Sequence, residues 1–195
     1  MQGGLYPYCK NPTVIHCPAD RRAIIGGIYS AYDSYSAVNG LNGTTGGTYP
    51  TPVFNKESSV RHTSAMIVFV EENDPRTQSA GPYTVNENIN SWCLPITGTT
   101  STSDNWAGLT WWDGPAAYHT TSATFSFIDG HAENHKWLDP ATIALGNDMN
   151  PTTKPSDGQA VSDATPAGGS HSPDDLRWVA NGYSFGPFGI NLGNY

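Results

Sequence analysis

The segment from Ala123 to Trp137 constrains the fold more than any other part of this chain of 195 residues. From Ala123 to Phe127, small or aromatic side chains alternate with polar ones, which is the period-two pattern of a strand with one buried face. Asp129 and Gly130 then break the pattern. Asp accepts hydrogen bonds from local backbone N–H groups and Gly takes positive φ without strain, so this pair suits a tight turn. We therefore predict an antiparallel hairpin that turns at Asp129 and Gly130.

Other short elements are expected around this hairpin. The apolar run from Ala65 to Val70 predicts a buried strand, and shorter strands are expected at Thr13 to Cys17 and Ala23 to Tyr29. Residues 147–172 contain hardly an apolar side chain, so we expect a surface loop or a partly disordered, mobile segment. A helix is expected near residues 173–181, because Pro and acidic residues precede it and Asn-Gly follows it.

The composition limits the classes of partner. The chain has 17 acidic and 9 basic residues, for a net charge of -8, and its Lys and Arg residues form no cluster. Nucleic acid and anionic membrane surfaces are therefore poor candidates as partners. No window of 18 or more apolar residues predicts a membrane span. With 21 Gly and 15 Pro, one loop-rich domain over residues 1–195 is expected.

A spacing motif joins the hairpin to the residues before it. Nine residues separate His119 from Asp129, and Gly130 follows, so the stretch fits the pattern H-x9-D-G. With the run from Phe127 to Trp137, it resembles the prepilin-type processing-associated H-X9-DG family, a group of bacterial type II secretion pseudopilin-like proteins. Three earlier segments resemble this family as well, so that the likeness covers roughly residues 5–140: Tyr8 to Asp20, Ser34 to Gly40 and Ile67 to Arg76.

The resemblance implies both a fold and a role. It implies an α+β, pilin-like head dominated by an antiparallel β-sheet, with long loops and little helix. The implied role is that of a structural subunit of a type II secretion or type IV pilus-like system. Such a subunit is exported to the periplasmic face or the cell surface, where its partners are other pilin-like or secretion-system subunits. Met1 to Gly4 lack the basic, apolar leader of this family, so we expect a soluble head without the usual N-terminal helix.

The three cysteines, Cys9, Cys17 and Cys93, lack the paired spacing of a zinc ribbon or a thioredoxin-like centre. In an exported protein one disulfide is expected, either between Cys9 and Cys17 or with Cys93. The alternative is that all three are buried free thiols.

Two groups of side chains are candidate metal ligands. An oxygen-rich group suits calcium, and the resemblance supports this ion because major pseudopilins carry a calcium site in a C-terminal loop; its members are Glu71, Glu72 and Asp74. A second group suits zinc, and its members are His119, Asp129, His131, Glu133 and His135. The structural alternatives are a solvated acidic turn, a hydrogen bond between His119 and Asp129, and a surface position for His135. Because the carboxylates cluster and the cysteines do not, we expect any bound ion to be oxygen-ligated.

The alternative class is an exported carbohydrate-active enzyme, either a polysaccharide lyase or a glycoside hydrolase, or a carbohydrate-binding protein on the same scaffold. The general base and the charge-neutralising groups of such an enzyme would come from Tyr118, His119, Arg61, His62 and Asp129. Sugar rings would stack on Trp106, Trp111, Trp112 and Tyr83. No Gly-x-Ser-x-Gly nucleophile motif is present. The resemblance to the H-X9-DG family favours a structural role over catalysis.

Overall fold

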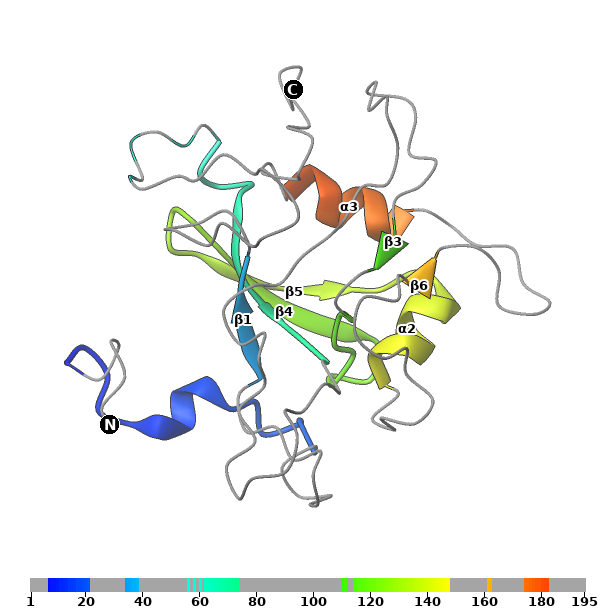
Figure 1. Ribbon diagram of the computed structural model, residues 1–195, viewed down its shortest axis with the longest axis horizontal. Helices are drawn as coiled ribbons and strands as arrows, with labels where there is room; N and C mark the ends of the chain where they lie inside the picture. Colours follow the sequence, from blue (N-terminus) through cyan, green and yellow to red (C-terminus); the bar gives the residue numbers. More distant parts are fainter. Residues whose placement is uncertain are drawn as a thin grey trace.

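The computed structural model describes residues 7–21, 34–38, 56, 58, 60, 62–73, 110–111, 114–147, 161–162 and 174–182. A four-stranded antiparallel sheet has the order β1 (Tyr35–Ala37), β2 (Ile67–Glu71), β4 (Ser122–Phe127), β5 (Ala132–Lys136), as Figure 1 shows. β3 (Thr110–Trp111) and β6 (Val161–Ser162) form a separate two-stranded sheet. The helices are η1 (Pro12–Ile15), α2 (Pro140–Asn147) and α3 (Asp174–Gly182). The described part is therefore an α+β structure in which the sheet dominates.

The predicted hairpin is confirmed as strands β4 and β5. Ser126 pairs with Ala132 next to the turn, and the pairing continues for the length of both strands. Gly130 has a φ of 91°, and the Asp129 carboxylate accepts the His131 backbone N–H at 3.1 Å. The Asp-Gly pair therefore forms the turn in the way that its side chains predict.

The core lies on one face of the sheet. Ala123, Phe125 and Phe127 alternate with more exposed residues along β4 and are buried, as their pattern predicts. A bulge in β2 places Val68 and Phe69 where the partner strand has one residue, so Ile67 and Val70 face the same core although three positions separate them. The strand predicted from Ala65 to Val70 is therefore present, although the bulge interrupts its alternation.

Both long helices cover this core. Val179 of α3 is fully buried in it, and Trp178, Ile143 and Leu145 pack against it. The structure has α3 where the sequence predicts a helix, whereas α2 was not predicted.

The start of α2 has a capping signal in the sequence. The Asp139 carboxylate accepts the Ala141 N–H at 2.9 Å, and Pro140 occupies the first helical position. Asp175 of α3 accepts the Leu138 and Asp139 N–H groups, at 2.9 Å and 2.8 Å, and so connects the starts of the two helices.

The N-terminal segment packs in a second cluster with the chain that precedes β4. In this cluster Cys17, Ala116 and Tyr118 are buried, and Tyr35 of β1 packs against them. The strand predicted from Thr13 to Cys17 is wrong, because Pro12–Ile15 forms a 3-10 helix. The Asn11 side chain accepts the Thr13 N–H at 3.0 Å, and Pro12 provides the fixed φ of a first helical residue.

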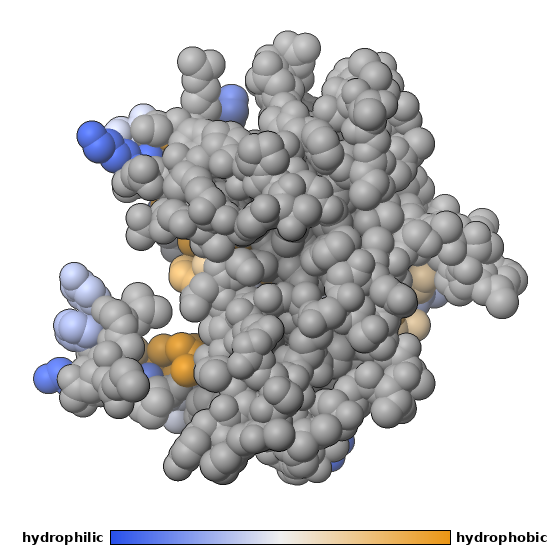
Figure 2. Space-filling model, in the orientation of Figure 1, coloured by the Kyte–Doolittle hydropathy of each residue, from blue (hydrophilic) through white to orange (hydrophobic). Residues whose placement is uncertain are grey.

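Among the described residues, none of the helices combines the length and the apolar character that crossing a bilayer requires. On the face that Figure 2 shows, apolar atoms of the described residues form small separate groups at the edges of the view. The strand expected at Ala23 to Tyr29 lies outside the described residues. Of the segment expected as a loop at 147–172, the structure describes Asn147 in α2 and the strand β6.

Candidate metal centre

Three side chains from separate parts of the chain converge beside the sheet. Cys17 follows η1, Glu71 ends β2, and His119 lies in the turn before β4. His119 Nε2 is 3.5 Å from Cys17 Sγ and 3.1 Å from Glu71 Oε1. One ligand atom from each residue lies within 4.8 Å of the others. This group can hold a metal ion.

Cys17 is held in place by hydrogen bonds around its backbone. Its N–H donates to the Ser34 hydroxyl at 2.9 Å, and that hydroxyl donates to the buried Asp20 carboxylate at 2.7 Å. The Cys17 carbonyl accepts the Asp20 N–H at 2.9 Å, which closes the turn through Pro18 and Ala19. Burial is the main cause that raises the pKa of the Cys17 thiol to about 11, and the Glu71 carboxylate adds to this rise.

Glu71 is a fully buried carboxylate at the end of a core strand. Its Oε2 accepts the Thr124 N–H at 2.7 Å, which leaves Oε1 directed at His119. Tyr35 pairs with Glu71 across β1 and β2, so both side chains lie on the same face of the sheet. Burial raises the pKa of the Tyr35 hydroxyl, and the charge of Glu71 raises it further.

His119 is the accessible member, with 38% of its side chain exposed. The turn that carries it is fixed by the Ser122 hydroxyl, which donates to the His119 carbonyl at 3.2 Å. The next residue, Thr120, has a φ of 74°, an uncommon conformation for a β-branched side chain. The backbone thus adopts an unfavourable conformation next to this imidazole.

The geometry differs from that of a catalytic triad. In a Cys-His-carboxylate triad the two ring nitrogens have separate partners, one facing the nucleophile and the other the carboxylate. Here Nε2 of His119 faces both Cys17 and Glu71. Three donor atoms that lie this close to one another can instead serve as ligands of a cation.

Of the predicted calcium ligands, the structure describes Glu71 and Glu72, and these two do not converge. Glu71 and Glu72 are both buried rather than solvated, and they point to different partners because successive residues of a strand face opposite ways. The Glu72 carboxylate accepts the Ser36 hydroxyl. Asp74 lies outside the described residues.

The predicted zinc group is also divided. Asp129 pairs with His131, whose Nδ1 is 2.5 Å from the Asp129 carboxylate, and so the expected contact between His119 and Asp129 is wrong. This pairing is the main cause that lowers the pKa of Asp129. His135 is half-buried against Trp178 rather than on the surface, with ring centroids 3.5 Å apart. Among the five residues of this predicted group, only His119 belongs to the three-residue group that the described part contains.

The candidate catalytic residues lie in different surroundings. Tyr118 is buried, and its hydroxyl donates to the Glu72 carbonyl at 3.0 Å, which removes it from solvent. His62 is exposed and lies at a pocket, whereas Arg61 lies outside the described residues. Trp106, Trp112 and Tyr83 are also outside them, and of Trp111 the structure describes only the backbone of β3.

Cys17 was not among the predicted metal ligands. The expectation of an ion held by oxygen atoms does not fit this group, which contains a thiol and an imidazole. Cys9 and Cys17 are both free, so the local disulfide is wrong, and Cys93 lies outside the described residues. One sequence feature could have pointed to Cys17, because it lies in the run from His16 to Asp20, which resembles the H-X9-DG family.

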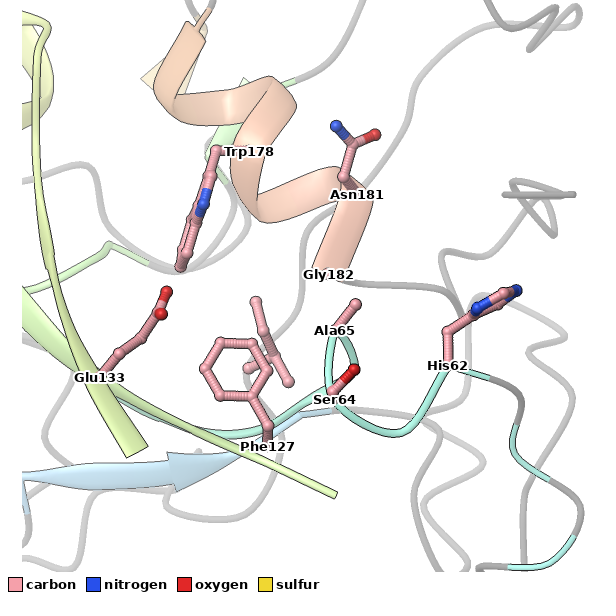
Figure 3. A pocket seen from close by; sticks show the side chains of 9 residues that line it. His62, Ser64, Ala65, Phe127, Glu133, Trp178, Asn181 and Gly182 are labelled. Atoms are coloured by element: carbon pink, nitrogen blue, oxygen red, sulfur yellow. The ribbon is translucent and has the colours of Figure 1, made fainter. Parts of the chain in front are cut away.

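A separate pocket of about 450 Å³ lies between α3 and the end of β4 (Figure 3). Trp178, Phe127 and Ile67 form its apolar part, and Glu133 and Asn181 supply polar groups. Gly182 packs against Ile67 and the Ala65 carbonyl, since an added Cβ would lie 2.7 Å from Ile67 Cδ1.

Neither a scan of protein-family models nor searches of curated proteins and of solved structures finds a match to this chain, so its likeness to the H-X9-DG family rests on the motif residues themselves.

Proposed function

We propose that this chain is a structural, pseudopilin-like subunit of a type II secretion or type IV pilus-like system, exposed outside the cytoplasmic membrane. One observation carries the proposal. Among the residues that the structure describes, polar side chains of the family-like motifs form buried hydrogen bonds within the domain, as expected of a scaffold.

Hydrogen bonds link described residues of these motifs to each other and to neighbouring parts of the chain. Ser36 of the second segment donates to the Glu72 carboxylate of the third, and Tyr118 donates to the Glu72 carbonyl. The Asn73 amide donates to the Gly146 carbonyl at 2.9 Å. Trp137, at the end of the hairpin motif, donates to a buried carbonyl at 2.8 Å. Residues that are buried and bonded in this way hold a domain together, and so they support a structural role.

The protonation of the buried groups supports the same proposal. A thiol needs a lowered pKa to act as a nucleophile, whereas burial raises the pKa of Cys17. The buried Tyr118 hydroxyl donates a hydrogen bond to a backbone carbonyl, which does not suit a base that must reach a polysaccharide. Calcium at Glu71, Glu72 and Asp74 is part of the same pseudopilin-like proposal, but the opposed directions of the two glutamates disfavour it.

Site-specific crosslinking in the native host tests the structural role. A photoreactive residue is placed at Leu138 or at Phe69, exposed apolar side chains that are 65% and 39% accessible. We expect adducts with pilin-like or secretion-system subunits, and the tagged chain in the envelope or sheared-filament fraction. The matched control is a photoreactive residue at Asn134, an exposed polar position of β5. A chain found in the cytoplasmic fraction, with no adducts from either apolar position, would contradict the proposal.

A second candidate is binding of a neutral saccharide in the pocket of Figure 3. Aromatic and polar side chains together are typical of sugar sites, and Phe127, Trp178, Glu133 and Asn181 line this pocket. Glu133 disfavours a uronate ligand because both would be anionic. His135 stacks on one face of Trp178, which reduces the surface for a sugar ring and places this candidate second.

Calorimetric titration with neutral oligosaccharides tests the second candidate. Replacing Glu133 by Gln or Asn181 by Ala should weaken any binding at the pocket, since each loses a polar group that lines it. Asn134→Ala is the control, because Asn134 neighbours Glu133 on β5 but does not line the pocket. Equal affinity in all three variants would place the sugar elsewhere.

A further inference from the structure

We propose that Cys17, Glu71 and His119 bind a zinc ion that fastens the N-terminal segment to the sheet. This inference does not depend on the pseudopilin-like role, because it follows from the three ligands alone.

The donor atoms select the metal. The group combines a thiol sulfur, an imidazole nitrogen and a carboxylate oxygen. Zinc binds all three donor types, whereas calcium takes six to eight oxygen ligands and magnesium prefers oxygen in octahedral geometry. A set with one carboxylate and one sulfur fits zinc and not the hard cations.

Two of the three donor–donor distances are close to those around a tetrahedral ion. With Zn–S near 2.3 Å and Zn–N and Zn–O near 2.1 Å, tetrahedral angles place sulfur about 3.6 Å from nitrogen, and nitrogen about 3.4 Å from oxygen. The corresponding distances are 3.5 Å from Cys17 Sγ to His119 Nε2 and 3.1 Å from His119 Nε2 to Glu71 Oε1. These two distances differ from the tetrahedral values by a few tenths of an ångström or less.

Supporting hydrogen bonds hold the ligands in this arrangement. Ser34 fixes the backbone of Cys17, and the Thr124 N–H holds the Glu71 oxygen that does not face His119. Such outer partners orient the donor atoms before the ion arrives. His119 is partly exposed while Cys17 and Glu71 are buried, so an ion would enter from the His119 side. Three protein ligands leave a fourth position for water or for the neighbouring Tyr35 hydroxyl.

The ion would connect segments that are far apart in the sequence. Cys17 lies 102 residues from His119, and Glu71 lies 48 residues from it. In the described part of the N-terminal segment, Cys17 is the residue buried in the cluster with Ala116 and Tyr118. A bound zinc would therefore protect this segment from local opening and stabilise the folded state by mass action.

The test is metal binding by the full chain after chelation and dialysis. We expect about one zinc per chain by elemental analysis, and a rise in melting temperature with zinc that calcium does not produce. Cobalt should bind at the same position and give a near-ultraviolet cobalt–thiolate absorption band. Zinc should also slow alkylation of Cys17, measured by peptide mass mapping.

The variants separate this site from adventitious binding. His119→Gln changes an exposed side chain and should keep the fold, yet it should weaken zinc binding by more than about 100-fold, beyond the 10–100-fold loss typical of an outer partner. Cys17→Ser should abolish the cobalt–thiolate band. The matched controls are Cys9→Ser, at the other described free thiol, and His131→Gln, at an exposed imidazole paired with Asp129. Zinc affinity that is unchanged in His119→Gln, or a band that persists in Cys17→Ser and disappears in Cys9→Ser, would overturn the proposal.

Discussion

Replacing Gly146 by Ala in α2 has two opposing effects on stability. It raises the helix propensity, but it places a Cβ too close to Ala116 and Ala117. Gly146 is the last residue but one of α2, and even in a helix interior this change stabilises a protein by no more than about 1 kcal/mol. An added Cβ at Gly146, however, would lie 2.8 Å from both the Cβ and the N of Ala117, and 2.9 Å from the carbonyl carbon of Ala116. Ordinary van der Waals contacts begin near 3.4 Å. Two of these three atoms belong to the backbone, so they cannot rotate away.

Moving the helix end outward would relieve the overlap but would lengthen two hydrogen bonds. The Gly146 carbonyl accepts the Ala117 N–H at 3.1 Å and the Asn73 amide at 2.9 Å. Overpacking costs about 1–3 kcal/mol and each weakened hydrogen bond up to about 1 kcal/mol. After the helix preference is subtracted, we expect a net loss of about 2 kcal/mol, or a melting temperature lower by about 4–8 °C.

Urea denaturation followed by tryptophan fluorescence measures this loss. The control is Ala144→Gly, at an exposed position of α2, which should lose only the helix preference of about 1 kcal/mol. If Gly146→Ala unfolds at the same or a higher urea concentration than the parent chain, the close approach of α2 to Ala117 is refuted.

Three further substitutions test other parts of the fold. Gly130→Val should cost more than about 1 kcal/mol, because φ is 91° in the hairpin turn, whereas Gly130→Asn should cost less; comparing their urea midpoints checks this. Burial lowers the pKa of His135 from 6.5, although Asp175 and Glu133 partly oppose this shift. The unfolded chain therefore binds more protons than the folded chain below about pH 6.5, so the free energy of unfolding decreases as the pH is lowered. His135→Phe should make the free energy of unfolding less dependent on pH between pH 7 and pH 5. Trp137→Phe leaves the buried carbonyl that accepts the indole N–H at 2.8 Å without this donor, and should lower the free energy of unfolding by about 1–3 kcal/mol in the same assay.

Local patterns predicted those elements whose cause lies in adjacent residues. The alternation along Ser122–Phe127 and the Asp129-Gly130 turn determined the hairpin, and Asn-Gly marked the end of α3. The helix α2 was missed although Asp139 and Pro140 formed a start signal, because the pair also suits the end of a strand. The same ambiguity applies to Asn11 and Pro12, which begin a 3-10 helix where a strand was expected.

The sequence by itself thus determined the hairpin, its turn, the strand β2 and the helix α3, since period, turn chemistry and end signals act over a few residues. It also contained all three ligands of the candidate metal centre, two of them already among the predicted site residues. Only the tertiary structure brought Cys17 to Glu71 and His119, and separated His119 from Asp129. The physical reason is that the bulge in β2, the strand order β1-β2-β4-β5 and the turn at Thr120 set the positions of these side chains. Contacts across 48 and 102 residues depend on such pairings and leave no periodic pattern in the chain.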